Sequence, residues 1–215
     1  MLIVGAKGFA KEVLEILNQL NQIENLVFYD DVSEDLPEML YGKFRILRTI
    51  DEASDFFKNV DNRFTIGIGN PILRKKLADK FIELGGVFTS TISPEANIGS
   101  FGNQLNEGIN IMTGSVITND VFIGKGVIVN LNSTIGHDCH IGNFVEISPG
   151  VSISGNCKIG DYAVLGTNAT VLPKITIGKN VIVGAGAVIT KDVPDNCLVV
   201  GMPAKVIKEL SPLNF

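Results

Sequence analysis

The chain has 215 residues, of which 45% are hydrophobic and 19% are charged, and its formal net charge at pH 7 is -5. This composition excludes an intrinsically disordered chain, and the negative charge argues against a nucleic acid as the main partner. No apolar stretch approaches the roughly 18 residues that a membrane-spanning helix requires, so no membrane partner is expected.

The start of the sequence and its cysteine content predict a cytoplasmic location. No basic segment followed by an apolar run, the pattern of a secretory signal, opens the chain. The chain has three cysteines. This small and uneven number suits a reducing compartment better than a disulfide framework. The chain also has 23 glycines and no tryptophan, so its core is expected to hold small aliphatic side chains and few large rings.

Residues 1–90 have the pattern of a small parallel α/β domain. The apolar run at 2–4 predicts a strand, and the glycines within 5–8 predict a tight turn. Apolar residues that recur between 13 and 20 then predict a helix. A second strand is expected at 26–29. This alternation of strands and helices is typical of a parallel sheet with a Rossmann-like first turn.

Polar residues follow the second and third predicted strands. Asp30 and Asp31 lie about 25 residues after the first glycine, where a carboxylate can bond a ribose hydroxyl. The third strand is predicted at 65–69, and Asn70 is then expected to cap the next helix. Gly69 and Asn70 would face the same crevice, where a helix N-terminus favours a phosphate. Two interpretations stay open here: a nucleotide-binding crevice, or solvated turns without a ligand.

The second part of the chain repeats with a period of six. An aliphatic residue occupies every sixth position from Ile111 to Ile189 without an insertion. A period of six fits neither an α-helix nor a long amphipathic strand, and it is typical of a solenoid of short strands and turns. If three hexads close one triangular coil, residues 18 positions apart stack at the strand spacing of roughly 4.8 Å.

Before Ile111 the repeat slips by one residue. Ile92 and Ile98 keep the spacing of six, but Leu105 comes one residue late. We therefore expect the solenoid to begin near Ile92 and residues 100–108 to form a small insertion.

Both histidines of the chain fall in one hexad. By the phase of the repeat, Cys139 points inward, His137 and Asp138 lie at a turn, and His140 points outward. One coil away from His137 lies Gly155, which leaves open space on one side of the imidazole. A neutral imidazole in a groove can act as a general base near neutral pH. The adjacent carboxylate can fix its tautomer and favour the imidazolium.

Two other interpretations of this hexad remain open: surface histidines of a solenoid, or a zinc cluster. A zinc site is disfavoured because β-helix enzymes of the carbonic anhydrase type use three histidine ligands, and His137 and His140 have unsuitable phase. No metal is therefore expected. Cys139 and Cys157 should stack in neighbouring coils as small buried residues.

The sequence resembles the sugar acetyltransferase family. The resemblance rests on the hexapeptide run, on IGHDCHIGNFVEISPG at 135–150 and on DVPDNCLVVGMPAK at 192–205. Within that family, the glycine turn VGAKGFAKEV followed by FYDD is similar to sialic acid O-acetyltransferases and to UDP- or GDP-4-amino-sugar N-acetyltransferases. The similarity covers nearly the whole chain.

The resemblance implies a homotrimer that uses acetyl-CoA to N-acetylate a nucleotide-linked amino sugar, in surface glycan or glycoprotein sugar biosynthesis. Acetyl-CoA would lie between adjacent solenoids, and the N-terminal domain would hold the nucleotide sugar. His137 matches the family's general base, Asp138 its acidic neighbour and Asn130 an active-site asparagine. Positions that match contacts to acetyl-CoA are Glu146, Thr167, Ala185 and Lys205. Positions that match contacts to the nucleotide sugar are Lys7, Gly8, Phe9, Asp30 and Asp31.

The implied fold class is a Rossmann-like α/β domain at 1–90 followed by an all-β left-handed parallel β-helix at 91–215. Two positions depart from the family pattern, because Glu146 and Phe9 stand where histidine is frequent. An ionised carboxylate cannot donate the hydrogen bond of a histidine, which puts the substrate in doubt more than the acetyl transfer. A sialic acid O-acetyltransferase and a non-catalytic scaffold remain alternatives.

Overall fold

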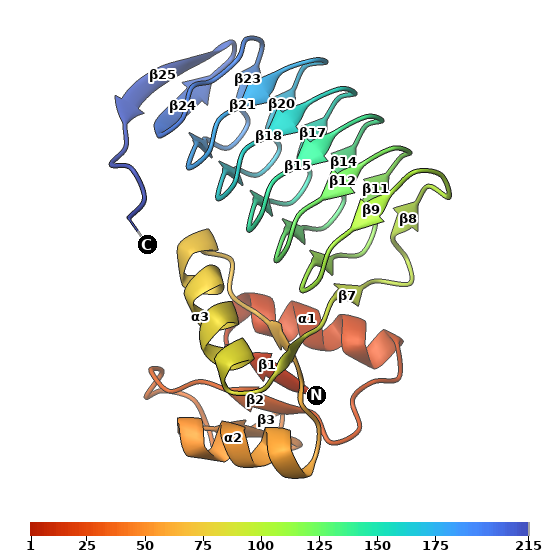
Figure 1. The fold of residues 1–215 in the computed structure, drawn as a ribbon, viewed down its shortest axis with the longest axis vertical. Coiled ribbons are helices and arrows are strands. Elements are labelled where there is room, and N and C mark those ends of the chain that lie inside the picture. Colours follow the sequence, from red (N-terminus) through yellow and green to blue (C-terminus); the bar gives the residue numbers. More distant parts are fainter. Residues whose placement is uncertain (215) are drawn as a thin grey trace. The chain divides into compact units, whose positions relative to one another are not determined.

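The computed structural model describes residues 1–214. By their internal contacts they divide into two compact units, Met1–Pro94 and a second unit that begins at Glu95. The first unit is α/β and the second is a coil of short strands (Figure 1). None of the helices within 1–214 is long and apolar enough to cross a membrane.

The first unit is built on one sheet with the strand order β3-β4-β2-β1-β5-β6. Its central strands are parallel, and only β3 joins its neighbour β4 in antiparallel pairing. The strands of this unit are β1 (Leu2–Val4), β2 (Val27–Tyr29), β3 (Met39–Leu40), β4 (Phe44–Leu47), β5 (Arg63–Ile66), β6 (Val87–Phe88) and β7 (Thr91–Ile92), and its helices are α1 (Gly8–Gln19), α2 (Ile50–Asn59) and α3 (Pro71–Glu83).

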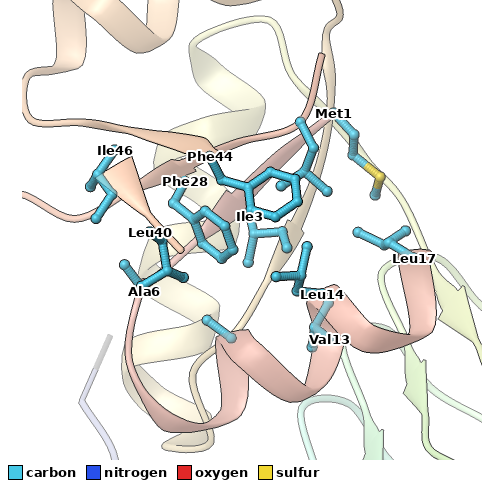
Figure 2. Packing of buried hydrophobic residues seen from close by; sticks show 12 residues of the cluster. Met1, Ile3, Ala6, Val13, Leu14, Leu17, Phe28, Leu40, Phe44 and Ile46 are labelled. Atoms are coloured by element: carbon cyan, nitrogen blue, oxygen red, sulfur yellow. The ribbon is translucent and has the colours of Figure 1, made fainter. Parts of the chain in front are cut away.

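Each face of this sheet has its own core. On one face, Ile3 and Phe28 of the strands belong to the same cluster as Val13, Leu14 and Leu17 of α1 (Figure 2). Successive residues of a strand point to opposite sides of the sheet, and the residues that point to the other face include a cluster of aromatic rings. There Phe64 of β5 lies 6.0 Å from Phe57 of α2 and 5.6 Å from Phe81 of α3, between ring centroids. The parallel sheet is thus covered on both faces.

The third parallel strand is shorter than the sequence predicts. The expected strand at 65–69 is observed as β5, which ends at Ile66. The chain leaves the sheet at Gly67, which lies directly against α1: a Cβ built there would be 2.5 Å from the Cα of Ala10. Close approach of two backbones requires glycine, so this residue marks a packing contact and not the continuation of a strand.

The second unit is a parallel β-helix with three faces, and strands of each face stack along the coil. Residues paired in register are 18 positions apart, as with Ile135 and Ile153, so three hexads make one coil as predicted. Face one contains β10 (Asn110–Ile111), β13 (Ile128–Val129), β16 (Glu146–Ile147), β19 (Val164–Leu165), β22 (Ile182–Val183), β24 (Cys197–Gly201) and β25 (Ala204–Glu209). Face two contains β8 (Asn97–Ile98), β11 (Val116–Ile117), β14 (Thr134–Ile135), β17 (Ser152–Ile153), β20 (Thr170–Val171) and β23 (Val188–Ile189). Face three contains β9 (Gln104–Leu105), β12 (Phe122–Ile123), β15 (His140–Ile141), β18 (Lys158–Ile159) and β21 (Thr176–Ile177).

The interior of the coil holds the aliphatic residue of each hexad, and these side chains are buried. Close stacking of strands leaves a narrow interior, which explains why the unit uses Ile, Val and Ala and no tryptophan. The fold class of α/β domain and left-handed parallel β-helix is confirmed.

The slip in the repeat is shorter than the insertion expected from the sequence. Ile98 pairs with Ile117, 19 positions away, whereas Leu105 pairs with Ile123 at the regular 18. The extra residue therefore lies in the turn between β8 and β9, where Gly102 adopts a φ of 68°. The predicted insertion at 100–108 is wrong beyond this turn, because the coil is regular again from β9 onward.

Candidate active site

His137 and Asp138 form a pair at the edge between faces two and three. Both follow β14, and their side chains remain 63% and 54% exposed. The imidazole Nδ1 lies 2.6 Å from the Oδ2 atom of Asp138. Asp138 has a φ of 57°, a conformation that aspartate tolerates better than most residues. Because the carboxylate engages Nδ1, the proton of the neutral ring belongs there and Nε2 is left to accept a proton.

The imidazole lies on the bare backbone of the next coil, as the spacing of 18 predicts. A Cβ built at Gly155 would be 2.5 Å from Nε2 of His137 and 2.7 Å from Cε1. The backbone N–H of Asn156 donates to the carbonyl of His137 at 2.8 Å. Glycine at 155 is thus a requirement of this ring position. The pair has the parts of a general base, namely an accessible nitrogen and a carboxylate that steadies the imidazolium.

The other residues of this hexad do not belong to the pair. His140 is the outward residue of β15 and stacks on Phe122 with ring centroids 4.4 Å apart. Cys139 and Cys157 are buried free thiols in neighbouring coils, and the N–H of Cys157 donates to the sulfur of Cys139. The side-chain hydrogen bond with Cys157 comes first and burial second in raising the pKa of the Cys139 thiol, against the smaller opposite effect of the Cys157 N–H, so Cys139 stays protonated as a packing residue.

The structure places Asn130, Thr167 and Ala185 at another edge of the coil from His137. Each of them directly follows a strand of face one or lies one residue further, at the edge between faces one and two. Face two separates the two edges within one chain. Asn130 uses its side-chain oxygen to accept the N–H of Leu131 at 2.8 Å.

The remaining predicted acetyl-CoA positions lie on face one. Glu146 is the first residue of β16, where it pairs with Ile128 and Val164 of the neighbouring coils. Lys205 lies in the terminal hairpin of β24 and β25, opposite Val200. Together with Thr167 and Ala185, these residues run along one side of the coil, and their contact with acetyl-CoA stays a prediction.

In the first unit, the glycine turn opens toward solvent at the start of α1. Gly5 has a φ of 100°, and Lys7 precedes the first residue of the helix as its N-cap. A Cβ built at Gly8 would meet none of the described atoms within 4 Å, so this backbone is open to a ligand. Phe9 is partly buried and packs against the core cluster that contains Val13 and Leu14, and its contact with a substrate stays a prediction.

The two predicted ribose-binding carboxylates already have partners in the protein. Asp30 is only 7% exposed, and its carboxylate accepts the N–H groups of Val32 at 3.3 Å and Ser33 at 2.9 Å. Asp31 accepts the hydroxyl of Tyr29 at 2.8 Å and lies 3.7 Å from Nζ of Lys80. Of the two, Asp31 is the more exposed and therefore the more accessible to a ligand.

Gly69 and Asn70 lie at the start of α3. The side-chain oxygen of Asn70 accepts the N–H of Leu73 at 3.0 Å and caps the helix, as expected. Sequence reasoning missed Arg74, which is fully buried and donates to the carbonyls of Ile68, at 3.2 Å, and Gly69. The phase of α3 contains the signal, because residue 74 lies on the same buried face as residues 78 and 81.

Sequence reasoning also missed Arg48. Its guanidinium donates to carbonyl groups of residues 30–37, which lie 11 to 18 positions earlier in the sequence and follow no repeat.

Across the part of the chain that is described, no three or more His, Cys, Asp or Glu side chains group in a way that could hold a metal ion.

Comparison with known proteins supports both units. Residues 1–81 match the model of the PglD N-terminal domain, and residues 138–173 and 156–191 match that of the bacterial transferase hexapeptide (six repeats). None of the curated proteins compared with the chain matches it.

Several solved structures are similar over almost the entire chain. A mutant of perosamine N-acetyltransferase from Caulobacter crescentus, in complex with CoA and GDP-perosamine, has 30% identity and a TM-score of 0.90, covering 97% of this chain and 96% of the other. The acetyltransferase domain of PglB from Neisseria gonorrhoeae has 31% identity and a TM-score of 0.86, with coverage of 96% and 98%. WeeI from Acinetobacter baumannii has 32% identity and a TM-score of 0.87, also with coverage of 96% and 98%. The chain belongs to the family of hexapeptide-repeat N-acetyltransferases that carry a PglD N-terminal domain.

Proposed function

We propose that this protein transfers the acetyl group of acetyl-CoA to the amine of a nucleotide-linked amino sugar, a UDP- or GDP-linked 4-amino-deoxy sugar. The observation that carries the proposal is the His137–Asp138 pair on the bare backbone of Gly155. It occurs in a chain that is 30% identical to an N-acetyltransferase whose structure contains CoA and GDP-perosamine.

The chemistry follows from the free Nε2 atom. The sugar amine attacks the thioester carbonyl of acetyl-CoA, and His137 accepts a proton from the nitrogen as the C–N bond forms. Asp138 holds Nδ1 and stabilises the imidazolium. Backbone N–H groups of the groove would stabilise the tetrahedral oxyanion. Collapse of this intermediate breaks the C–S bond, and the imidazolium returns its proton to the leaving CoA thiolate.

The placement of the site residues supports a homotrimer with shared active sites. Within one chain His137 lies at one edge of face two, and Thr167 and Ala185 lie at the other. The outward residues of that face are uncharged: Asn97, Val116, Thr134, Ser152, Thr170 and Val188. If face two of each copy turns toward a threefold axis, His137 of one copy approaches Thr167 and Ala185 of the next. Such a site needs two copies.

The buried free thiols support a reducing, cytoplasmic location. There the product, an acetamido sugar still attached to its nucleotide, would be available to glycosyl transfer in the assembly of a polysaccharide or glycoprotein glycan.

A panel of acceptors tests the proposal. Release of free CoA is measured with UDP- and GDP-linked 4-amino sugars and with free sialic acid. We expect turnover of a nucleotide-linked amine only, and a mass increase of one acetyl group on the sugar. Turnover of sialic acid alone would replace the proposal by O-acetylation, and no release with any acceptor would favour a scaffold.

The same assay tests the general base. His137→Ala should lower kcat by about 10²- to 10⁴-fold, the usual contribution of a general base, while the variant keeps its oligomeric state and its affinity for acetyl-CoA. His140→Ala is the matched control, because this ring lies in the same hexad and stacks on Phe122 away from the pair. A His137→Ala enzyme with near-normal turnover would contradict the assignment.

A further inference from the structure

The segment of residues 30–37 joins β2 to β3 without regular secondary structure. It contains Asp30 and Asp31, two of the predicted nucleotide contacts, and it reaches the glycine turn through Asp35. We propose that Arg48 is the positioning residue of this segment and thereby sets the affinity of the enzyme for the nucleotide part of its substrate. This inference rests on the proposed function.

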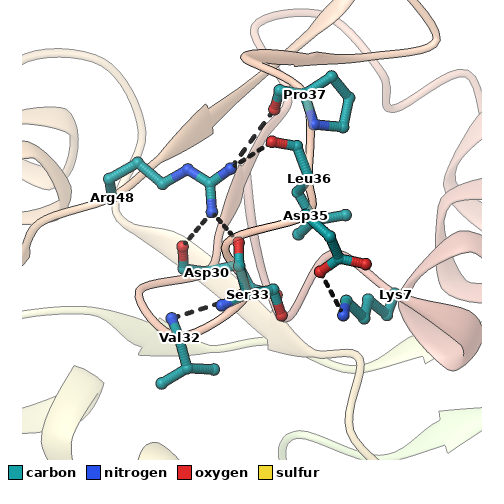
Figure 3. A network of polar contacts seen from close by, with 8 residues as sticks. All are labelled: Lys7, Asp30, Val32, Ser33, Asp35, Leu36, Pro37 and Arg48. Carbon is teal, nitrogen blue, oxygen red and sulfur yellow. Dashed lines mark hydrogen bonds and ion pairs between the residues drawn. The ribbon is translucent and has the colours of Figure 1, made fainter.

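The guanidinium group of Arg48 donates hydrogen bonds to four backbone carbonyl groups of the segment (Figure 3). Its Nη1 atom donates to the carbonyl of Asp30 at 3.0 Å and to that of Ser33 at 2.8 Å. Its Nη2 atom donates to the carbonyls of Leu36 at 2.9 Å and Pro37 at 3.5 Å. Partly buried carbonyls outside a sheet or helix require such donors, so the segment depends on Arg48 for its path.

Arg48 is itself fixed between two elements. It directly follows β4, and its backbone N–H donates to Oε2 of Glu52 at 2.8 Å. Glu52 and Thr49 form the capping box that starts α2. The guanidinium therefore projects from a rigid junction of the first unit, which is what a positioning residue needs.

The anchored segment lies at the glycine turn. Asp35 forms an ion pair with Lys7, whose Nζ atom lies 2.7 Å from the Oδ1 atom of Asp35. Lys7 is the N-cap of α1, next to the open backbone of Gly8. The backbone N–H of Asp30 is also tied to the sheet, by a bond to the carbonyl of Leu47 at 3.0 Å. The segment is therefore held to the sheet at Asp30, and a change in its path beyond that residue would displace Asp31 and the Asp35 partner of Lys7.

A lysine cannot replace this arginine. The guanidinium presents five N–H donors in a planar fork, whereas an ammonium group is a compact point charge with three donors. Without the fork, water would take over some carbonyls and the segment would sample other conformations. Substrate would then have to order it on binding, which costs affinity. We expect the acetyl transfer itself to be unaffected, because the His137–Asp138 pair is formed by residues of the coil alone.

Steady-state kinetics of Arg48→Gln and Arg48→Lys test the proposal in the full-length enzyme. We expect KM for the nucleotide amino sugar to rise about tenfold or more, with kcat within about twofold and KM for acetyl-CoA unchanged; this is the pattern of lost binding without lost transition-state stabilisation. UDP and GDP alone, used as binding probes in calorimetry, should lose affinity by the same factor. Arg45→Gln is the matched control, since Arg45 is on β4 and its guanidinium pairs at 2.5 Å with Oε1 of Glu52, the oxygen that does not bond to Arg48, and its KM values should stay normal.

Other outcomes would separate the two ideas. If the wild-type enzyme turns over a nucleotide amino sugar but both Arg48 variants keep its KM, Arg48 is not a positioning residue and the proposed function stands. A purely structural role would also overturn the inference: it would lower the melting temperature and the active fraction, and so kcat, with KM unchanged. If Arg48→Gln fails to fold, the same criteria apply to Arg48→Lys, and hydrogen exchange of residues 30–37 should increase in that variant relative to Arg45→Gln.

Discussion

The position of the His137 ring depends on the absence of a side chain at residue 155, one coil away. His137 occupies the space that a side chain at 155 would fill, and Asp138 holds its Nδ1 atom at 2.6 Å. The coil repeats its backbone every 18 residues, as the pairing of Ile135 with Ile153 shows. Any substitution at 155 therefore acts on the imidazole directly.

Gly155→Ala should lower kcat by roughly 10²-fold, the lower end of a general base's contribution, with little effect on thermal stability. The reason is that the added Cβ would lie 2.5 Å from Nε2 of His137, and the ring, being the end of a side chain, moves more easily than the backbone. Kinetics and thermal unfolding are measured together. Ser154→Ala is the control and should behave as wild type; an active Gly155→Ala enzyme would contradict the observed ring position.

At the scale of an element, α2 begins with a cap that also holds Arg48, the arginine bonded to the carbonyls of residues 30–37. Glu52 accepts the backbone N–H groups of Arg48 at 2.8 Å and Thr49 at 3.1 Å. These hydrogen bonds, that of Arg48 first, hold the pKa of Glu52 below its usual value of 4.5. Because the pKa is lower in the folded state, Glu52 stabilises the fold above the unfolded pKa, and this contribution is lost as the pH falls through the folded pKa.

Glu52→Ala should lower the free energy of unfolding by about 1 kcal/mol at pH 7, the typical value of a cap. The difference from wild type should shrink as the pH falls below 4.5, because protonation then removes the same interaction from the wild-type protein. Urea unfolding at pH 7 and at lower pH measures it. Glu12→Ala, an exposed position on α1, should change stability by no more than about 0.5 kcal/mol. A difference that persists unchanged at low pH would contradict the role of the carboxylate.

At the scale of the whole molecule, the coil separates the proposed general base from the predicted acetyl-CoA positions, although the reaction requires them to be close together. His137 lies at one edge of face two, and Thr167 and Ala185 lie at the other. A general base must come within hydrogen-bond reach of the reacting amine. The proposed trimer would join the two edges by packing copies against each other, so we expect assembly and activity to be inseparable.

Subunit complementation tests this arrangement. His137→Ala and Ala185→Trp are each expected to be inactive, the first without its base and the second with its acetyl-CoA groove blocked. In trimers co-expressed at equal amounts, about one quarter of the sites should combine His137 of one copy with Ala185 of the next and recover activity. Mixing the two separately assembled proteins is the control. Mixed trimers without activity would show that the site lies within one chain, and an active Ala185→Trp protein would remove Ala185 from it.

The sequence by itself determined the coil and the position of its histidines. In a repeat of fixed length, the phase of a residue is its place on the coil, so inward Cys139, outward His140 and the stacking of His137 on Gly155 all follow from counting. The glycine turn and the cap at Asn70 were also predictable, because their signals are local. The slip near Ile98 was found but assigned too long an insertion, since register is set by pairing partners and not by the gap itself.

Only the tertiary structure decided the details of the first unit. Arg48 reaches partners that lie between 11 and 18 residues away, and Asp35 meets Lys7 across 28 residues. Nothing periodic relates these residues, because loops take their path from individual hydrogen bonds and not from a repeated backbone. Burial of the Asp30 carboxylate follows from the same loop path. A pattern of residue types indicates the chemistry of a site. Contacts between residues that are distant in the sequence decide which of its atoms are accessible to a ligand.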